Sequence, residues 1–484
     1  MSFYSLLSEL FATFADVRLN FTVVNFMQVS LTGVKVESFK ISVMRFYNRE
    51  KELALLEKVR QVSFSVHSQM TVLTGRRRIG KTSLVFKSCE GTPTVYLFVS
   101  RSNEADLCSG FTAEIRQSLN IYVPEFISFA ELFRFLMDLG MRMKYNLIID
   151  EFQEFYYINP VVYSLMQDTW DRYRKQSYVN LVVSGSVYTL MNQIFRDSKE
   201  PLYGRADTIM KLLPFTTSVL KEILADHKPD YVKEDLLALY TFTGGVPKYI
   251  EQFMDRGCTD MESMVDLMLQ PDSSFLTEGT ALLIQEFGKK YGNYFSILSA
   301  ISNGKNTLPE MEAAMGGISL GGQLKRLEED YDLVKKKRPI LSKENSQTVR
   351  YDVSDLFLRF WFRYFIKYQN YIEIQNYECL ADIIKKDYPT FSGLALEMYF
   401  RQQMIESREF AEIGSWWQGK NNKDQDEIDI VGLYAEEKKA LVAEVKRQSK
   451  NFKPDLFTLK VEALRKKVLF KYEIESRLFS MDDM

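Results

Sequence analysis

Short, uniformly apolar runs alternate with helical stretches between residues 44 and 215. The runs lie at Thr71–Thr74, Thr94–Ser100, Asn146–Asp150, Val179–Ser184 and Thr208–Leu213. Two of them contain continuous rather than alternating hydrophobic positions, which indicates strands that are buried on both faces. The alternation of strands and helices predicts an α/β fold in which a parallel sheet is covered by helices on both sides.

Beyond residue 215 the pattern changes several times. It becomes helical, with one Gly244-Gly245-Val246-Pro247 break, and predicts a lid over the sheet domain. Three short helices and a two-stranded ribbon then follow, which is the outline of a winged helix. Aromatic residues at helical spacing from Phe357 to Tyr371 indicate core packing. A final α/β unit begins near Gly393. The predicted division is 1–43 for an N-terminal extension, 44–215 for the sheet core, 216–288 for the lid, 289–353 for the winged helix, 354–392 for a helical connector and 393–484 for the last domain.

The first 43 residues share no motif with the rest of the chain. Met44 opens a well-formed beginning and is therefore a candidate for the true first residue. The longest uncharged run near the start, Leu19–Val34, is too short to span a bilayer and contains polar residues. The sequence predicts no membrane partner.

Composition fits a soluble protein of about three domains, because 484 residues exceed one hydrophobic core. A net charge of −2 provides no overall basic field, so any nucleic-acid contact must come from local patches. The four cysteines lie far apart without a CxxC pair, which indicates reduced thiols in the cytoplasm. Only two histidines occur, which argues against a histidine-rich zinc site.

One eight-residue stretch matches the pattern GxxxxGK[ST] of a phosphate-binding loop. It follows an apolar β-branched run and precedes a helical stretch, which is the strand, loop and helix order that the chemistry requires. Glycines allow successive N–H groups to point at phosphate oxygens, Lys81 reaches the β- and γ-phosphates, and the Thr82 hydroxyl ligates magnesium. The candidate binding residues are Gly75, Arg76, Arg77, Arg78, Ile79, Gly80, Lys81 and Thr82, with Ser83 beginning the helix.

Four further residues are candidates for the same site. Asp150 and Glu151 end a hydrophobic strand, where Asp150 would hold magnesium and Glu151 would act as general base toward water. Ser184 ends another buried strand and is a candidate sensor of the γ-phosphate, although an ordinary turn explains the same letters. Arg205 is a candidate arginine finger, although a surface arginine is the commoner explanation.

The C-terminal unit contains a second set of charged residues. Glu397 lies in a helical stretch, Asp429 in a strand, and Glu444 and Lys446 at the end of another strand, where alternation places them on one face. Such carboxylates could hold magnesium while Lys446 orients or activates water against a phosphodiester, as in a PD-(D/E)xK nuclease. Ordinary amphipathic strands with a solvated charged face are the alternative.

Basic residues elsewhere leave their partners open. Lys325 and Arg326 on the predicted recognition helix and the basic run 335–338 on the wing suit phosphate contacts, but acidic residues are interspersed. DNA binding and protein contact both remain open for this unit. The arginines between Gly75 and Ile79 are solvated, or touch DNA or a neighbouring subunit.

These motifs together resemble the archaeal-type ATPase family within the AAA+/STAND group of P-loop NTPases. The resemblance rests on the N-terminal box Asn48–Leu53, the loop Gly75–Thr82, Ile149–Gln153, Ser184-Gly185-Ser186, Tyr203-Gly204-Arg205 and Gly244–Pro247. It implies an ATPase with a helical lid, in which Pro247 lies near the adenine and the N-terminal box helps to seat the nucleotide.

The C-terminal part resembles the domain of unknown function that often follows such ATPases and is similar to PD-(D/E)xK nucleases. This second resemblance rests on residues 351–361 and Gly414-Ser415-Trp416-Trp417. It predicts a restriction-endonuclease-like α/β domain. Ile428 stands where the nuclease motif has proline.

The expected function is a cytoplasmic ATPase that uses ATP and Mg²⁺ and whose nucleotide state controls a nuclease-like domain acting on DNA. The alternative is a regulatory switch whose C-terminal module binds protein or DNA without cutting it. Self-association or a protein client would suit either function.

Overall fold

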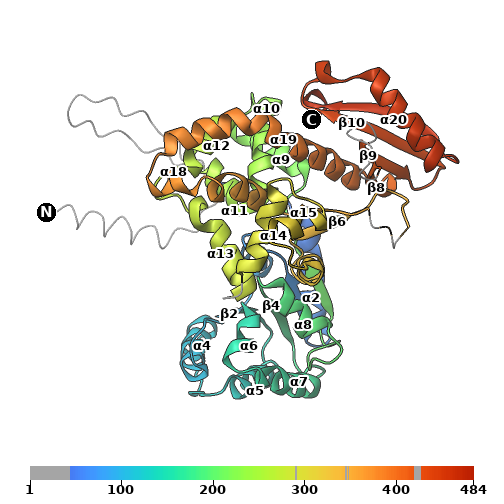
Figure 1. The fold of residues 1–484 in the computed structure, drawn as a ribbon. Coiled ribbons are helices and arrows are strands. Elements are labelled where there is room, and N and C mark those ends of the chain that lie inside the picture. Colours follow the sequence, from blue (N-terminus) through green and yellow to red (C-terminus); the bar gives the residue numbers. More distant parts are fainter. Residues whose placement is uncertain (1–43, 289–290, 344–345, 347, 419–426) are drawn as a thin grey trace.

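The computed structural model describes residues 44–288, 291–343, 346, 348–418 and 427–484. The predicted extension 1–43 lies outside the described residues, and Met44, the proposed first residue, is the first residue described. Figure 1 shows a sheet with surrounding helices, a helical middle region and a smaller C-terminal sheet coloured red. Among the described residues, no helix is long and apolar enough to cross a membrane.

A five-stranded parallel sheet forms the first region, in the order β2-β3-β4-β1-β5. All five strands expected from the sequence are present. The strands are β1 (Gln69–Thr74), β2 (Thr94–Phe98), β3 (Tyr145–Asp150), β4 (Val179–Ser184) and β5 (Thr208–Lys211). The helices are α2 (Glu50–Ser65), α3 (Lys81–Cys89), α4 (Glu104–Leu119), α5 (Phe129–Leu139), α6 (Phe155–Ile158), α7 (Val161–Tyr173) and α8 (Tyr188–Arg196), with a 3-10 turn at Phe152–Glu154.

The two central strands contribute to a hydrophobic core on each face of the sheet. Leu147 and Ile149 of β3 belong to one core, and Ile148 between them belongs to the other. Burial on both faces explains the continuous apolar runs. The register pairs Leu73 with Ser184, so β1 and β4 end at the same edge as β3. The residues after these strands therefore meet at one edge of the sheet.

The helical middle region begins with the expected lid. Its helices are α9 (Thr217–His227), α10 (Lys233–Thr243), α11 (Pro247–Met254), α12 (Met261–Met268) and α13 (Phe275–Phe287). All but the first two residues of α10 are buried, because α9, α11, α12, α17 and α19 pack around it. The lid is thus continuous with the rest of the middle region.

Three helices and a ribbon follow in the predicted order. They are α14 (Gly292–Ser302), α15 (Leu308–Ala314), α16 (Gly321–Glu329), β6 (Val334–Lys337) and β7 (Arg350–Val353). The strands β6 and β7 are antiparallel. Residues 334–353, which comprise both strands and the segment between them, are called the ribbon below.

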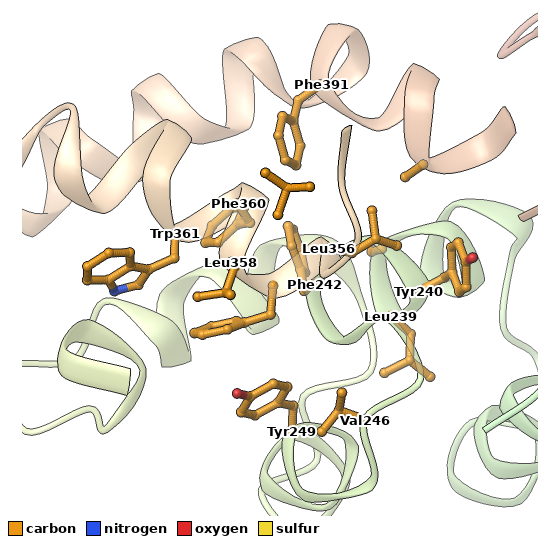
Figure 2. Packing of buried hydrophobic residues seen from close by; sticks show 14 of the residues in the cluster. Leu239, Tyr240, Phe242, Val246, Tyr249, Leu356, Leu358, Phe360, Trp361 and Phe391 are labelled. Carbon is orange, nitrogen blue, oxygen red and sulfur yellow. The ribbon is translucent and has the colours of Figure 1, made fainter. Parts of the chain in front are cut away.

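The aromatic segment packs into the core, as predicted. It forms α17 (Leu356–Trp361), a π-helical turn (Phe362–Ile366) and α18 (Gln369–Glu373). Figure 2 shows Phe242 of the lid beside Phe360 of α17. The ring centroids of Phe242 and Phe360 are 5.0 Å apart. This packing joins the lid to the segment that follows the ribbon.

A mixed four-stranded sheet forms the C-terminal α/β domain, as expected. It comprises β8 (Phe410–Trp417), β9 (Glu427–Tyr434), β10 (Lys439–Lys446) and β11 (Glu473–Ser480), in the order β11-β10-β9-β8. Only the β10–β11 pair is parallel. Helix α20 (Pro454–Lys467) precedes β11, and short 3-10 turns lie at Ser449–Asn451 and Met481–Asp483. Helix α19 (Tyr377–Ser407) runs without interruption through Gly393, where the sequence places the start of this domain.

Gly245 is expected to be indispensable for lid stability. Its φ is +80°, and an added Cβ would lie 2.5 Å from the Phe215 carbonyl oxygen. Strain and overlap together predict that Gly245→Ala lowers the free energy of unfolding by about 2–4 kcal/mol. Gly257→Ala is the matched control, because its φ is +67° but nothing lies within 4 Å of an added Cβ. Urea unfolding measures both, and equal losses would contradict the role of the close contact.

Candidate functional site

The P-loop curls around the start of α3. Gly75 has a φ of +148°, and an added Cβ would lie 2.8 Å from the Leu212 carbonyl oxygen. Arg78 and Gly80 are also in the left-handed region, at +67° and +87°. Gly80 caps α3 without a side-chain hydrogen bond, so the first N–H groups of this helix have no side-chain cap. A helix beginning in this way suits an anion.

Lys81 is held by the loop itself. Its Nζ donates to the carbonyl oxygens of Gly75 (2.9 Å) and Arg76 (3.0 Å), and only 7% of the residue is exposed. Burial lowers the pKa of the ammonium group, and the charges of Glu151 and Asp150 oppose that shift. A buried cation satisfied only by neutral carbonyls is a fitting partner for phosphate oxygens.

The Asp150 carboxylate accepts hydrogen bonds from four donors. The Thr82 hydroxyl and the Tyr96 phenol donate to Oδ2, each at 2.9 Å. The Ser184 hydroxyl donates to Oδ1 at 2.6 Å, and the Glu151 amide donates at 2.9 Å. The oxygens of Thr82 and Asp150 thus lie side by side and fit the ligand set of Mg²⁺. Bound magnesium would neutralise phosphate charge there.

Glu151 is fixed toward the same space. Its backbone is left-handed, with a φ of +53°. Ser186 Oγ and Gln153 Nε2 donate to its Oε2, at 2.7 and 2.5 Å. A carboxylate held in this way has the orientation that the predicted general base needs.

A cavity of about 720 Å³ lies in front of these groups. Its phosphate end is lined by Arg77–Ser83, Asp150, Glu151 and Ser186. Its other end is lined by Arg49 of the N-terminal box, by Phe46 and Tyr47 before the box, by Phe215 and by Pro247 of the lid. The residues that the sequence assigned to the adenine side and to the phosphate side therefore surround one cavity.

Ser184 and Ser186 have different positions. Ser184 is buried and bonds Asp150, whereas Ser186 lines the cavity and bonds Glu151. The sequence stretches Ser184-Gly185-Ser186 and Ile149–Gln153 are part of the family resemblance, but only Ser184, Asp150 and Glu151 were assigned roles. Ser186, Gln153 and Tyr96 were assigned none.

Arg205 does not reach the cavity within one chain. It ion-pairs with Asp171 (3.1 Å) and lies two residues before Asp207, whose amide donates to Met70 O near the start of β1. The P-loop follows the other end of β1, about 20 Å away for a six-residue strand. The position of Arg205 contradicts the prediction that it acts as an arginine finger within its own chain. Action across an interface between copies stays a prediction.

The three P-loop arginines make ion pairs and hydrogen bonds with residues far along the chain. Arg76 pairs with Asp355 (2.9 Å), Arg77 NH1 donates to Gln285 Oε1 (2.8 Å), and Arg78 pairs with Glu278 (2.6 Å). The sequence analysis had considered solvent, DNA or another subunit as partners of these arginine side chains, and it had not considered residues of the same chain.

The C-terminal charged residues also converge. Lys446 Nζ lies 2.8 Å from Glu444 and 3.8 Å from Asp429. Lys460 of α20, which the sequence analysis missed, donates to both Glu444 oxygens at 3.2 Å. Asp429 Oδ2 accepts a hydrogen bond from the Val445 amide (2.8 Å). Burial raises the pKa of Asp429, and this hydrogen bond opposes the rise. Two lysines therefore neutralise this acidic cluster.

Glu397 faces the same cluster from α19. Burial raises its pKa, and the neighbouring charge of Asp429 adds to the shift. Arg401, one turn later, donates to the Asp429 carbonyl and to Ser415. Among the described residues, no group of three or more His, Cys, Asp or Glu side chains is arranged to hold a metal ion. Asp429, Glu444 and Glu397 as metal ligands stay a prediction.

The ribbon contacts the C-terminal domain of its own chain through Ile340 and Arg350. Lys337 pairs with Asp352 across the ribbon, and Arg350 pairs with Glu427 at 2.6 Å. Ile340 N donates to Ser415 O at 2.8 Å. These contacts lie within one chain, so DNA binding and protein contact both stay predictions for this unit.

The fold and the cavity are those of a P-loop NTPase. The family described as an ATPase domain predominantly from Archaea matches residues 46–253. A second family, of archaeal and bacterial proteins of unknown function, matches residues 361–455. An uncharacterized protein of Methanocaldococcus jannaschii is 31% identical over 413 residues, covering 83% of this chain and 87% of that protein. The chain belongs to this family of archaeal-type ATPases with an appended C-terminal domain.

Solved structures agree on the fold. A Walker-type ATPase of Pyrococcus abyssi has a TM-score of 0.51 and 19% identity, and the match covers 66% of this chain and 96% of that one. The ORC2 protein of Aeropyrum pernix is also similar, with a TM-score of 0.41, 14% identity and coverage of 68% and 94%. At such identities the likeness to the Pyrococcus protein shows a shared fold alone.

Proposed function

We propose that ATP binding and hydrolysis at the P-loop control the C-terminal domain, and that this domain cleaves DNA with Mg²⁺ in the cytosol. The observation that carries the proposal is the ribbon. The residues that flank it contact the P-loop side, and the ribbon itself contacts strands β8 and β9 of the C-terminal domain. A two-stranded element that is attached at both ends is a physical route for coupling two sites.

The near end of the ribbon is flanked by two aspartates that contact the ATPase core. Arg76 of the P-loop pairs with Asp355 and donates to the Asp332 carbonyl. Lys211, at the end of β5, pairs with the Asp332 carboxylate at 2.7 Å. A rearrangement of the P-loop on nucleotide binding would act on both residues that bracket the ribbon.

The far end of the ribbon touches the strands that carry the second site. Arg350 pairs with Glu427, which lies two residues before Asp429 and on the same face of β9. The guanidinium also lies 4.7 Å from the centre of the Trp417 ring. Movement of the ribbon would therefore shift β9 and its acidic residue relative to β10.

The chemistry of the cluster supports phosphodiester cleavage. Asp429, Glu444 and Glu397 would hold magnesium, which would neutralise charge on the scissile phosphate. Lys446 would orient or activate the attacking water. The ion pairs of Lys446 and Lys460 with Glu444 suit an inactive state. In that state the lysines hold the carboxylate until the domain rearranges. The mixed sheet flanked by α19 and α20 suits the nuclease resemblance.

The experiment follows phosphate release and cleavage of linear DNA by the full chain in Mg²⁺, with and without ATP. Lys446→Ala is expected to reduce cleavage about 100-fold or more while ATP turnover stays within twofold. Lys450→Ala, four residues along and exposed, is the matched control. Arg350→Ala is expected to make cleavage independent of ATP. Cleavage that is unchanged in Lys446→Ala would remove the nuclease assignment.

A second candidate function has one observation in its favour. Because Lys446 and Lys460 occupy Glu444, the cluster as it stands suits a binding module that never holds metal. In that case the domain would retain DNA or a protein client without cutting. DNA retardation in gels that persists in Asp429→Asn, with no cleavage by the unaltered protein, would favour this function.

A further inference from the structure

Helix α10 of the lid has one end near the nucleotide cavity and its other end against the C-terminal domain. After α10, two glycines in the left-handed region turn the chain into α11, where Pro247 and Lys248 line the cavity. The Lys248 amide also donates to the carbonyl oxygen of Arg78 in the P-loop, at 3.3 Å. Since α10 has 11 residues, it carries the chain about 16 Å away from this contact.

The first turn of α10 forms an ion pair with the C-terminal domain. Arg447 NH2 donates to Glu234 Oε2 at 2.5 Å, and the arginine side chain is only 17% exposed. The same guanidinium donates to Ser392 Oγ of α19 and lies 5.3 Å from the centre of the Tyr388 ring. Glu234 Oε1 is buried and has no hydrogen-bond partner among the described residues. An ion pair that leaves one buried oxygen unsatisfied competes poorly with other arrangements.

The end of β10 is held from two sides. Glu444 and Lys446 lie on the face of the acidic cluster, where Lys446 Nζ is 2.8 Å from Glu444. Val445 between them belongs to the hydrophobic core on the opposite face. Arg447 follows directly and pairs with the lid. Because Lys446 and Arg447 are adjacent in the chain, a shift of one backbone shifts the other.

The lid and the C-terminal sheet also share a hydrophobic core. Ala443 and Val445 of β10 belong to the same cluster as Leu237 and Leu239 of α10. Figure 1 shows α19 running beside α10 toward the C-terminal sheet, and α19 contacts both α10 and β10. Close-packed interiors transmit displacements. A shift of α10 is therefore expected to reach the end of β10.

We propose that Arg447 positions Lys446, and that the lid controls this position through Glu234. The inference rests on the proposed function and adds a second contact between the two sites, because the lid acts on β10 and the ribbon acts on β9. In the nucleotide-free arrangement the pair holds the end of β10, so Lys446 stays on Glu444. Movement of the lid on ATP binding releases Arg447 and, with it, Lys446.

The test measures backbone hydrogen exchange of residues 439–447 in the full chain, with and without a non-hydrolysable ATP analogue. In the unaltered protein the analogue is expected to speed exchange at least about fivefold, because release of Arg447 loosens the strand end. Glu234→Gln keeps the size of the side chain and removes its charge. This variant is expected to exchange as fast without nucleotide, and the analogue is expected to add less than about a twofold effect.

A double-mutant cycle separates this contact from a general loss of stability. Glu234→Gln, Arg447→Gln and the double variant are expected to show the same exchange, because the second substitution has no pair left to remove. Glu262→Gln is the matched control. Glu262 also lies in the first turn of a lid helix, α12, but it is exposed. Its substitution is expected to leave the response to the analogue unchanged.

DNA cleavage provides the functional measurement. Glu234→Gln is expected to raise the cleavage rate without ATP to within about twofold of the rate with ATP, and to leave the KM for DNA unchanged. Residues 439–447 that do not respond to the analogue in the unaltered protein, or that respond equally in Glu234→Gln, would overturn the inference. The expected exchange response in a protein that cleaves no DNA would support the lid contact and overturn the proposed nuclease function.

Discussion

Lys81→Ala is expected to reduce ATP turnover at least about 100-fold and to weaken ATP binding. The lysine is the buried cation at the mouth of the loop, held only by the Gly75 and Arg76 carbonyls. Loss of one preorganised group that stabilises developing charge costs about 10²–10³ in turnover. Steady-state phosphate release and calorimetric titration with ATP measure the two effects.

A second lysine of the same helix provides the control. Lys87 lies near the end of α3 and pairs with Glu90 at 2.9 Å, with its side chain about half exposed. Lys87→Ala is expected to leave turnover within twofold, because an exposed pair of this kind contributes little. Turnover that persists in Lys81→Ala would refute the assignment of Gly75–Thr82 as the nucleotide-binding loop.

The fold of the sheet region could be predicted because each signal was local. Residues such as Ile148 and Val182 lie in strands that are buried on both faces, and burial on both faces leaves a continuous apolar run in the sequence. The P-loop has a fixed spacing because glycine is needed at Gly75, where any side chain would strike the Leu212 carbonyl. Local constraints of this kind are visible in a single sequence.

The partners of the P-loop arginines could not be predicted for the opposite reason. Arg76 and Asp355 are 279 positions apart, and Arg77 and Gln285 are 208 apart. Their meeting depends on how the lid, α13 and the ribbon pack against the core. These contacts are determined by long-range packing, which no sequence motif reveals.

Arg205 and the basic wing show a further limit. Both were assigned by charge, which a sequence displays, although the role of a charge depends on what faces it. Arg205 lies at the edge of the sheet away from the loop, and the wing residue Lys337 pairs with Asp352 of the same ribbon. Residue type indicated the chemistry available at these positions, and tertiary structure determined its partner.

Glu151→Gln is expected to reduce ATP turnover about 10²–10⁴-fold while ATP binding is retained. The amide keeps the size of the side chain and loses the basic oxygen. Ser186 can still donate to the remaining carbonyl oxygen, so the loop and Asp150 should keep their geometry. Single-turnover phosphate release measures the chemical step, and calorimetry measures the dissociation constant.

Asp150→Asn distinguishes a base from a metal ligand. Asp150 accepts from Thr82 and is the residue expected to hold Mg²⁺, so its substitution should weaken Mg²⁺-dependent ATP binding as well as turnover. Glu90→Gln is the control, because Glu90 lines the same cavity without touching Asp150 or Glu151. A weaker ATP affinity in Glu151→Gln equal to that in Asp150→Asn would contradict the general-base role. If Glu151→Gln retains its affinity for ATP, the protein stays in the ATP-bound state. DNA cleavage by this variant then shows that ATP binding alone opens the C-terminal domain, and its absence shows that hydrolysis is needed.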